Sequence, residues 1–445
     1  MTTKILKKQK LRNNEYYDIQ DVFDSLYSKS LENKNFTKLM ELITTRENIL
    51  LAYRNIKKNK GSMTKGTDAR DITFYSNMPQ DVFVKHIQNM FRNYHPKSVR
   101  RVEIPKPNGK MRPLGIPCMG DRIVQQCIKQ VLEPICEAKF HKHSYGFRPN
   151  RSTHHAISRS MSLINMNKLH YVVDIDIKGF FDNVNHSKLK KQMWNLGIQD
   201  KNLISIIDKI LKSEIDTVGA PTKGTPQGGI LSPLLSNIVL NELDWWISNQ
   251  WESFQTAHDY TTVRKNGYVD QSNKYKTMKT TNLKEIWLVR YADDFKIFCR
   301  DYKTANKIYI ATKQWLKERL RLEISEDKSK ITNLKTNYTE FLGFRLMAKP
   351  KKGKYVCQSR MSEKARNSVT TKLKHQIVYM RSNYEAKQVN KLNAMILGVH
   401  NYYKIATNVS FDFNTINYLT SITLHNRLKQ VISYKPSTSK AFKKF

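Results

Sequence analysis

Apolar and polar residues follow two patterns along this chain, one typical of helices and one typical of strands. Apolar residues recur every three or four positions across 19–51, which predicts helical structure over most of residues 1–60. The same spacing predicts helices at 121–140, 187–211, 225–246 and 301–322, and a basic helical region from Met361 almost to the end. This last change of pattern predicts a separate C-terminal helical domain.

Shorter segments rich in β-branched and aromatic residues predict strands between the helices. Residues 99–105 and 111–117 are predicted to pair across a turn at Lys106-Pro-Asn-Gly109. Residues 247–283 are polar, lysine-rich and poorly periodic, so we expect a surface insertion there. Together the helices and strands predict an α+β fold. Further strands are predicted at 171–177, 287–291, 295–299 and 339–348.

The chain is strongly basic. Its 445 residues include 77 Lys and Arg against 38 Asp and Glu, a net charge of +39. This excess runs along the whole chain, which favours an extended polyanion as the partner. An anionic membrane surface is the alternative, but the sequence has neither an apolar run of membrane-spanning length nor a basic amphipathic anchor helix. We therefore expect no membrane partner.

Cysteine and histidine residues do not predict a metal site. The five cysteines include no Cys-x-x-Cys pair, so we expect reduced thiols and neither a disulfide framework nor a zinc site. His141 and His143, and the adjacent pair His154 and His155, are not spaced like metal ligands beside a cysteine pair. We expect them to have structural or RNA-facing roles.

The most informative short motif is Tyr291-Ala-Asp-Asp294, between two predicted strands. Adjacent residues on a regular strand point to opposite faces, so Asp293 and Asp294 can share a site only if a tight turn presents them. Two carboxylates at a hairpin tip suit a divalent cation. A polar turn without a metal is the alternative, because Asp-Asp is common in turns.

A second group of carboxylates lies near the end of an apolar predicted strand. Asp174 and Asp176 are two residues apart and therefore share one strand face. A carboxylate buried on such a strand is costly unless it is paired or bound to a metal. With Asp293 and Asp294 they supply the carboxylates that two-metal-ion phosphoryl transfer requires. A structural role for Asp174 stays open, and Asp182 is expected to be an ordinary strand-end acid.

Basic and glycine-rich segments accompany these acids. Lys106, Lys110 and Arg112 lie on the first predicted strand pair, where forked contacts from Arg112 could help to close over a triphosphate. A solvated basic face is the alternative. Pro226-Gln-Gly-Gly229 places two glycines before a predicted helix, where a backbone, base or phosphate can come close.

Three of these motifs occur in the order and spacing of reverse transcriptases: Asp176-Ile-Lys-Gly-Phe-Phe-Asp182, residues 225–237, and Tyr291-Ala-Asp-Asp294. Specifically, the chain resembles bacterial group II intron-encoded reverse transcriptases and maturases over most of its length. The resemblance implies a right-hand polymerase with fingers, a palm built on an antiparallel sheet, and an all-α thumb or maturase domain. Supporting segments are 104–117, Tyr145-Gly-Phe-Arg-Pro149, Phe341-Leu-Gly-Phe344 and 392–403.

The resemblance implies a division into four parts. Residues 1–95 would be an N-terminal helical extension with the start of the fingers, and 96–170 would complete the fingers. Residues 171–350 would be the palm, carrying the insertion near 247–283. Residues 351–445 would be the helical thumb and a basic tail.

The resemblance also implies roles for individual positions. Asp176, Asp293 and Asp294 would be catalytic and, with Ile177, would bind two Mg²⁺ ions, for which Mn²⁺ is a substitute. Phe181 would exclude a ribose 2′-hydroxyl. The implied nucleotide-binding residues are Lys106, Arg112, Phe181, Gln227 and Lys328, and the implied primer or template contacts are Arg148, Tyr291, Phe341, Leu342 and Gly343.

The activity implied is that of an RNA-directed DNA polymerase that binds a group II intron RNA, assists its splicing and copies it into cDNA for retrohoming. Its partners would be the intron RNA, a primed RNA template, dNTPs and target DNA, in a bacterial cytoplasm and at the nucleoid. Related proteins often continue into an HNH endonuclease, but paired cysteine motifs are absent here, so DNA cleavage is not expected.

Two alternatives stay open. One is an RNA-binding splicing cofactor with little polymerase activity. The other is a reverse transcriptase of a retron or phage-defence system. The sequence leaves the oligomeric state open.

Overall fold

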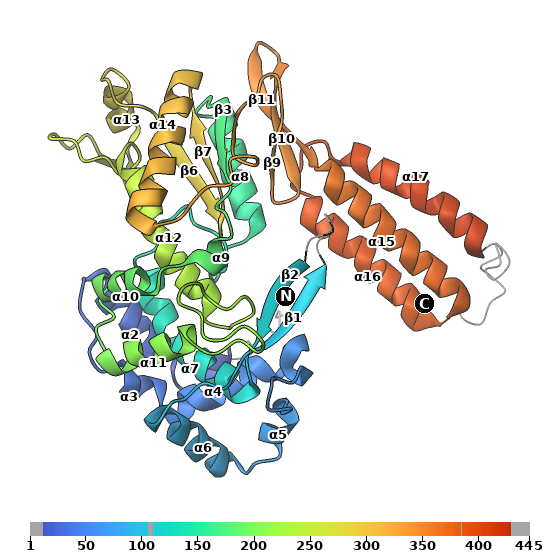
Figure 1. Cartoon of the computed structure of the whole chain (residues 1–445). Helices are drawn as coiled ribbons and strands as arrows, with labels where there is room; N and C mark the ends of the chain where they lie inside the picture. Colours follow the sequence, from blue (N-terminus) through green and yellow to red (C-terminus); the bar gives the residue numbers. More distant parts are fainter. Residues whose placement is uncertain (1–11, 106–108, 110, 384, 429–445) are drawn as a thin grey trace, which may run out of the picture.

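A four-stranded antiparallel sheet lies at the centre of the upper part of the molecule, with strand order β6-β7-β3-β8 (Figure 1). The computed structural model describes residues 12–105, 109, 111–383 and 385–428. Helix α14 packs on β3, β7 and β8, whereas α8 and α12 pack against β6. The apolar run of β3 is therefore buried. The strands are β3 (Tyr171–Ile175), β6 (Ile286–Tyr291), β7 (Asp294–Cys299) and β8 (Lys330–Asn333).

Below the sheet, helices from the first part of the chain surround one buried helix, α7 (Met119–Glu137). Its residues contact α2, α3, α4 and α6, so this region has an apolar centre of its own. The hairpin of β1 (Arg100–Pro105) and β2 (Met111–Ile116) projects from it. The surrounding elements are α1 (Asn13–Tyr16), α2 (Gln20–Leu31), α3 (Leu39–Ile43), α4 (Arg46–Lys57), η1 (Lys60–Met63), α5 (Ile72–Ser76) and α6 (Gln80–Arg92).

The middle of the chain links these two regions. The helix predicted over 187–211 is in fact two helices, because Gly197 adopts a φ of +93° that interrupts the helical path. The elements here are α8 (Thr153–Asn165), α9 (Phe180–Asn183), α10 (His186–Asn195), α11 (Lys201–Leu211), α12 (Ser232–Asn249), α14 (Tyr302–Trp315) and the π-helical turn η2 (Leu316–Leu320).

The segment predicted as an insertion, 247–283, extends from the body beside α14 (Figure 1). It holds the short strand pair β4 (Thr262–Val263) and β5 (Val269–Asp270) and the helix α13 (Ser272–Met278). The weak periodicity of this segment reflects very short elements with mostly exposed side chains.

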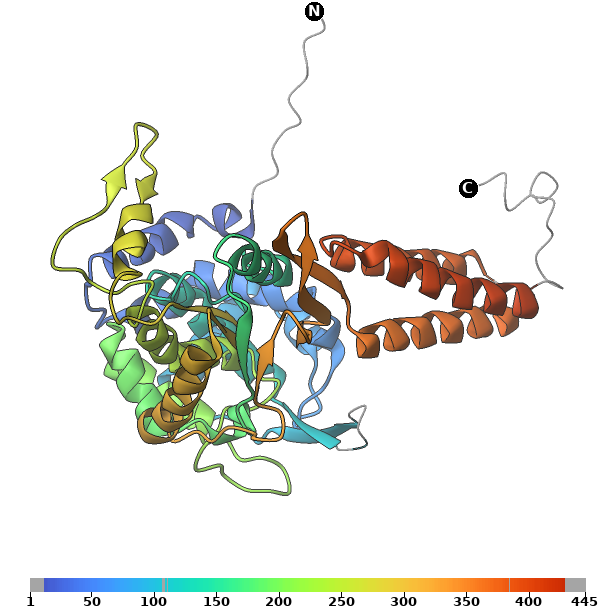
Figure 2. The same cartoon turned by 90° about the horizontal axis from the view of Figure 1, so that it is seen from above.

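The C-terminal part forms a separate arm. A three-stranded sheet, β11-β10-β9, leads into three long helices that project away from the body (Figures 1 and 2). Its elements are β9 (Thr339–Phe341), β10 (Phe344–Lys351), β11 (Lys354–Met361), α15 (Glu363–Ser382), α16 (Ala386–Tyr403) and α17 (Val409–Leu428).

Two predictions about the arm were wrong in detail. Residues 339–348 form two strands, because Leu342 and Gly343 adopt positive φ angles and turn the chain back. The all-α region predicted over 351–445 begins at Glu363, because a turn at Lys352-Gly353 returns the chain into β11.

The other main elements agree with the sequence pattern. The strand pair around 99–117, the helix predicted at 121–140 and the strand predicted from Tyr171 are all present. The turn at Lys106-Pro-Asn-Gly109 lies largely outside the described residues. All five cysteines are buried and free. In the described part of the chain, no helix combines the length and apolarity needed to cross a bilayer.

Candidate active site

The predicted hairpin is present, and it carries both aspartates. Tyr291 at the end of β6 pairs with Asp294 at the start of β7, which leaves Ala292 and Asp293 at the tip. Ala292 has a φ of +58°, the left-handed conformation that a two-residue turn needs. Arg290 is fully buried, and one of its Nη atoms donates a 2.8 Å hydrogen bond to the Ala292 carbonyl. This hydrogen bond therefore fixes the turn from the interior of the protein.

A neighbouring loop is packed tightly against this tip. The backbone N–H of Tyr145 donates to the Arg290 carbonyl at 2.8 Å. A Cβ placed on Gly146 would fall far inside van der Waals contact of the Ala292 backbone nitrogen. Only glycine therefore fits at this position, which accounts for Gly146 in the Tyr145-Gly-Phe-Arg-Pro149 segment.

Asp176 lies just beyond the end of β3. Its backbone N–H donates to Ser329 Oγ at 3.1 Å, and its carbonyl accepts from the Ser325 N–H at 2.7 Å. Its side-chain Oδ2 accepts a 3.0 Å hydrogen bond from Lys328 Nζ. Ile177 has a buried hydrocarbon side chain without a ligand atom, so only its backbone carbonyl could bind a cation.

Asp174 has a structural partner, which settles the question that the sequence left open. It lies opposite Lys296 in the β3–β7 register, and the two side chains form a buried ion pair. Thr339 Oγ1 of β9 also donates to the Asp174 carboxylate, at 2.8 Å to Oδ2. Asp176 follows Asp174 by two residues and Asp294 precedes Lys296 by two, so in these antiparallel strands the ion pair lies directly behind the candidate catalytic acids.

The carboxylates face one cleft of about 600 Å³, lined by Asp174, Asp176 and Asp294 together with Lys296 and Lys328. Asp294 reaches solvent through this cleft. Burial by the surrounding protein raises the pKa of Asp294 to about 6; Lys296 opposes this rise, and the nearby carboxylates of Asp174, Asp293 and Asp176 add to it. Such crowding of negative charge is what a bound cation would relieve.

The chemistry of these donors fits a divalent cation, because Mg²⁺ prefers carboxylate oxygens and retains waters for phosphate ligands. In the conformation observed, the Asp176 carboxylate forms an ion pair with Lys328. Among the described residues, no three His, Cys, Asp or Glu side chains are already arranged to hold a metal ion. The donor types are present, and the side chains would have to turn toward a common point.

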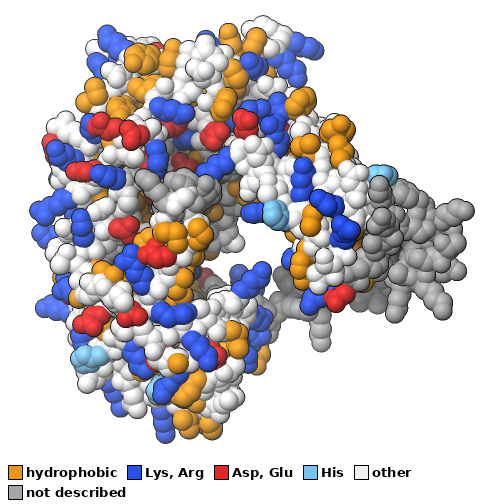
Figure 3. Space-filling model, turned by 45° about the vertical axis from the view of Figure 1, so that its right-hand side comes forward, with side chains coloured by type: hydrophobic (Ala, Val, Ile, Leu, Met, Phe, Trp, Pro, Cys, Tyr) orange, Lys and Arg blue, Asp and Glu red, His pale blue; other side chains and the backbone are white. Residues whose placement is uncertain are grey.

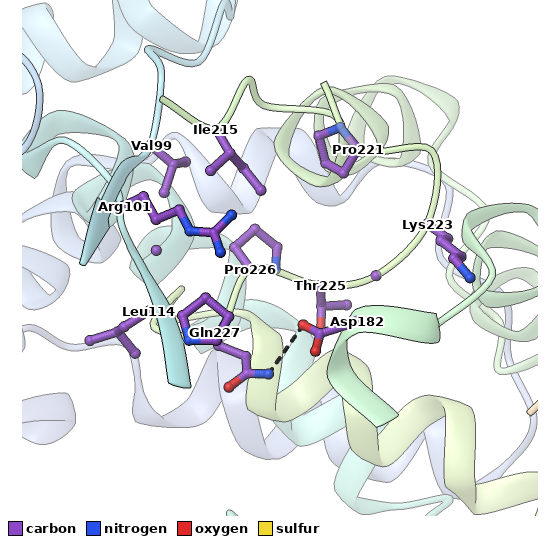
Figure 4. A pocket seen from close by; sticks show the side chains of 13 residues that line it. Val99, Arg101, Leu114, Asp182, Ile215, Pro221, Lys223, Thr225, Pro226 and Gln227 are labelled. Atoms are coloured by element: carbon purple, nitrogen blue, oxygen red, sulfur yellow. Dashed lines mark hydrogen bonds between the residues drawn. The ribbon is translucent and has the colours of Figure 1, made fainter. Parts of the chain in front are cut away.

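A second cavity, of about 250 Å³, lies between the β1–β2 hairpin and the segment before α12 (Figure 4). Arg101 and Lys223 bring positive charge to it, and Gln227 Nε2 donates to Asp182 Oδ1 at 3.1 Å. Asp182 is therefore more than an ordinary strand-end acid, because it fixes the Gln227 side chain. We call this cavity the hairpin pocket; it is also lined by Val99, Leu114, Ile215, Pro221, Thr225 and Pro226.

The glycines of the Pro226-Gln-Gly-Gly229 segment permit a close approach of two backbones, as predicted. Gly115 N–H of β2 donates to the Gln227 carbonyl at 2.7 Å. Gly228 has a φ of +114°, and a Cβ there would collide with the Gly115 carbonyl oxygen. The segment is thereby fixed against the hairpin.

Of the other predicted nucleotide-binding residues, Phe181 is partly exposed on α9 and packs edge-on against Phe180. Lys106 and the side chain of Arg112 lie outside the described part of the structure, although the Arg112 backbone pairs with Ile104.

The predicted primer contacts gather near the arm. Tyr291 is partly exposed beside the acidic tip, and Leu342 and Gly343 form the β9–β10 turn. The Phe341 side chain is buried beside Lys296, so it supports the site from within.

Arg148 does not face the cleft. Its side chain is 3% exposed and donates to the Glu137 carboxylate and to the carbonyls of His141 and Ser144. The expectation that it contacts primer or template is therefore wrong for this conformation, because its donors are used inside the protein. Its observed role is to fix the loop that supports the acidic hairpin.

Figure 3 shows a wide opening between the body and the helical arm, with Lys and Arg side chains along its margins. Carboxylates at the end of a sheet, in a molecule whose opening is bordered by Lys and Arg, are typical of enzymes that transfer phosphoryl groups on nucleic acid.

Comparison with known proteins gives the family. Residues 104–346 match the family model described as reverse transcriptase (RNA-dependent DNA polymerase). Protein YkfC of Escherichia coli (strain K12) is 35% identical, with 74% of this chain and 88% of the relative covered. The group II intron-encoded protein LtrA of Lactococcus lactis subsp. cremoris is 29% identical, with 95% and 80% covered. A putative COX1/OXI3 intron 2 protein of Saccharomyces cerevisiae is 29% identical, with 77% and 42% covered.

The chain belongs to the group II intron reverse transcriptases and maturases, and it is an RNA-directed DNA polymerase. The predicted resemblance is confirmed.

Sequence reasoning missed three residues that support the site. Lys296 is a lysine within the apolar run Phe-Lys-Ile-Phe, and Arg290 likewise interrupts an apolar strand. A charge at such a position requires a buried partner, which is a signal for both. Gly146 gave no comparable signal, because its contact with Ala292 joins segments far apart in the chain.

Proposed function

We propose that Asp176, Asp293 and Asp294 form the catalytic centre of this reverse transcriptase and bind two Mg²⁺ ions, with Ile177 contributing its carbonyl. The observation that carries this proposal is the convergence of Asp176 and Asp294 on one cleft from the ends of β3 and β7, with the Asp293 carboxylate near enough to raise the pKa of Asp294. When bound, the ions supply the charge that activates a primer 3′-hydroxyl and stabilises the leaving pyrophosphate. Mn²⁺ would substitute for Mg²⁺ because it accepts the same oxygen ligands.

We further propose a right-hand arrangement around this centre. Residues 1–170 would provide the N-terminal extension and fingers, 171–350 the palm, and the region after 351 the thumb. The orientation of the β1–β2 hairpin, the central sheet and the helical arm around a common opening supports this arrangement (Figures 1 and 3). RNA template and primer would lie in the opening.

The nucleotide would bind beside the catalytic centre. Gln227, fixed by Asp182, lies in the hairpin pocket, and Phe181 lies on the short helix that also carries Asp182. Lys328, which contacts Asp176, would neutralise triphosphate charge together with Lys106 and Arg112. Phe181 would occupy the space that a ribose 2′-hydroxyl needs.

The biological task we propose is binding of a group II intron RNA, assistance to its splicing and copying of that RNA into cDNA for retrohoming. The relatives that are named as intron proteins support this task. Splicing assistance depends on binding folded RNA, so it should survive loss of the catalytic acids.

The test is primer extension on poly(rA)/oligo(dT) with dTTP and Mg²⁺, comparing the wild type with Asp293→Ala. Extension by the wild type alone supports the assignment, provided that both proteins bind the template equally. Equal extension by the variant would refute it. No extension by either protein would favour the splicing cofactor with little polymerase activity.

A further inference from the structure

A cavity of about 400 Å³ lies between α10, α12 and the end of α14, and it shares no lining residue with the active-site cleft. Three of the six tryptophans of the chain line it, namely Trp245, Trp246 and Trp315, together with Gln192, Glu242 and Arg319. We call it the tryptophan pocket. Its volume lies within the range that small-molecule sites occupy.

The walls of the tryptophan pocket suit a flat aromatic ligand. The rings of Trp246 and Trp315 stack with centroids 5.3 Å apart and an angle of 22° between their planes. Trp245 is 40% exposed, and its indole N–H donates to the Lys139 carbonyl, which fixes the ring. Because these indole rings are already fixed, a base can stack on them and the side chains lose no further conformational freedom.

One buried polar atom of a residue that lines the pocket lacks a partner. Gln192 is 6% exposed, and its Nε2 donates to the Val239 carbonyl at 3.2 Å and to Glu242 Oε2 at 2.8 Å. Both partners are acceptors, so they fix which amide atom is the nitrogen. Gln192 Oε1 then has no hydrogen-bond partner. A buried acceptor of this kind is satisfied by a ligand that brings a donor.

The charges around the pocket favour a phosphate-bearing ligand. Lys188 lies 2.9 Å and Arg319 lies 3.5 Å from the Glu242 carboxylate, so this acid is neutralised. Helix α10 carries Lys188, Lys190 and Lys191 and no carboxylate; Lys188 pairs with Glu242 and Lys190 with Asp208. A base can therefore enter the pocket while its phosphate stays near positive charge.

We propose that the tryptophan pocket binds an unpaired, amino-bearing nucleobase of an RNA, stacked on the indoles and donating to Gln192 Oε1. RNA as the source of the base rests on the proposed function, whereas the pocket itself does not. This site would hold RNA outside the active-site cleft, and polymerisation on a short template would not use it.

The test uses the full chain labelled with 5-fluorotryptophan, whose six ¹⁹F resonances are assigned through single Trp→Phe variants. AMP should shift the resonances of Trp245, Trp246 and Trp315, whereas ribose 5-phosphate should not. The resonances of Trp194, Trp251 and Trp287 should stay in place. No tryptophan lines the active-site cleft or the hairpin pocket, so binding there does not imitate this result.

Purine riboside 5′-monophosphate, which lacks the amino group, should bind roughly two- to tenfold more weakly than AMP. Gln192→Met should remove that preference, and Trp315→Leu should remove the response of Trp246. Trp194→Leu, on the exposed surface of α10 outside the pocket, is the matched control and should respond to AMP like the wild type.

The proposal is overturned if AMP leaves Trp246 and Trp315 unshifted, or if ribose 5-phosphate shifts them equally. It is also overturned if they shift with protein concentration alone, which would assign the pocket to contact between two copies of the chain. Asp293→Ala should keep the AMP response. A chain that responds to AMP but extends no primer would refute the proposed catalysis and leave the pocket intact.

Discussion

Gly146 shows how strongly a single residue constrains the acidic hairpin. A methyl group at this position would collide with the backbone of Ala292, one residue before the proposed catalytic pair of Asp293 and Asp294. We predict that Gly146→Ala lowers the rate of primer extension about a hundredfold, because a displacement of about 1 Å misplaces reacting groups. Single-turnover extension measures the effect.

Gly398→Ala is the control for this change, because nothing lies within 4 Å of a Cβ at that helical position. It should retain wild-type extension. If Gly146→Ala extends primers at the wild-type rate, the contact with Ala292 does not position the site.

The buried pair of Lys296 and Asp174 makes a prediction about stability. Lys296→Met would leave the Asp174 carboxylate buried without its cation, which costs about 3–5 kcal/mol of unfolding free energy. Adding Asp174→Asn should restore much of that loss, because the amide oxygen can still accept from Thr339. Urea unfolding of the single and double variants checks this.

The exposed pair of Lys313 and Glu326 provides the contrast, because its partners are solvated and Lys313→Met should leave stability nearly unchanged. A double variant as unstable as Lys296→Met would show that the ion pair is not the source of the loss.

At the scale of elements, Glu252 joins the start of the insertion to the loop beneath the acidic hairpin. Its carboxylate is 3.0 Å from His143 Nε2 and 2.7 Å from Lys142 Nζ, and the Tyr275 hydroxyl of α13 donates to its carbonyl at 3.2 Å. Burial raises the pKa of Glu252, but the hydrogen bond and charge of His143, together with Lys142, lower it to about 2.

The pKa of Glu252 is lower in the folded chain than in the unfolded chain, where it is near 4.5. The ionised carboxylate therefore stabilises the fold above pH 4.5. This stabilisation is lost as the pH falls from 4.5 toward 2. Glu252→Gln should therefore be less stable than wild type at pH 7, and the difference should shrink at pH 3. Thermal unfolding at both values tests this, with Glu326→Gln as the exposed control. A difference independent of pH would contradict the assignment.

Elements were predictable where local pattern decides them. The period of apolar residues located α7 and β3, and Tyr291-Ala-Asp-Asp294 located the hairpin. The break at Gly197 and the return at Lys352-Gly353 depend on single backbone angles, which apolar periodicity does not report. The inward direction of Arg148 depends on Glu137 and on carbonyls that only the folded chain brings near.

At the scale of the whole molecule, negative and positive side chains are concentrated in different places. The proposed catalytic carboxylates Asp176 and Asp294 line one cleft at the end of the central sheet, whereas the excess of Lys and Arg is spread over the body and arm that border the opening (Figure 3). A polyanion is therefore attracted along an extended surface, and the local negative charge is left for cations.

This distribution predicts a steep dependence of RNA binding on salt that is independent of catalysis. If six to ten phosphates are neutralised, affinity should fall about 10³- to 10⁵-fold between 50 and 200 mM KCl. Asp293→Ala should give the same slope of log affinity against log salt, because it removes no cation from the binding surface. Filter binding or fluorescence anisotropy with intron RNA measures both slopes. A shallow slope would mean that a few local contacts, and not the +39 charge of the chain, hold the RNA.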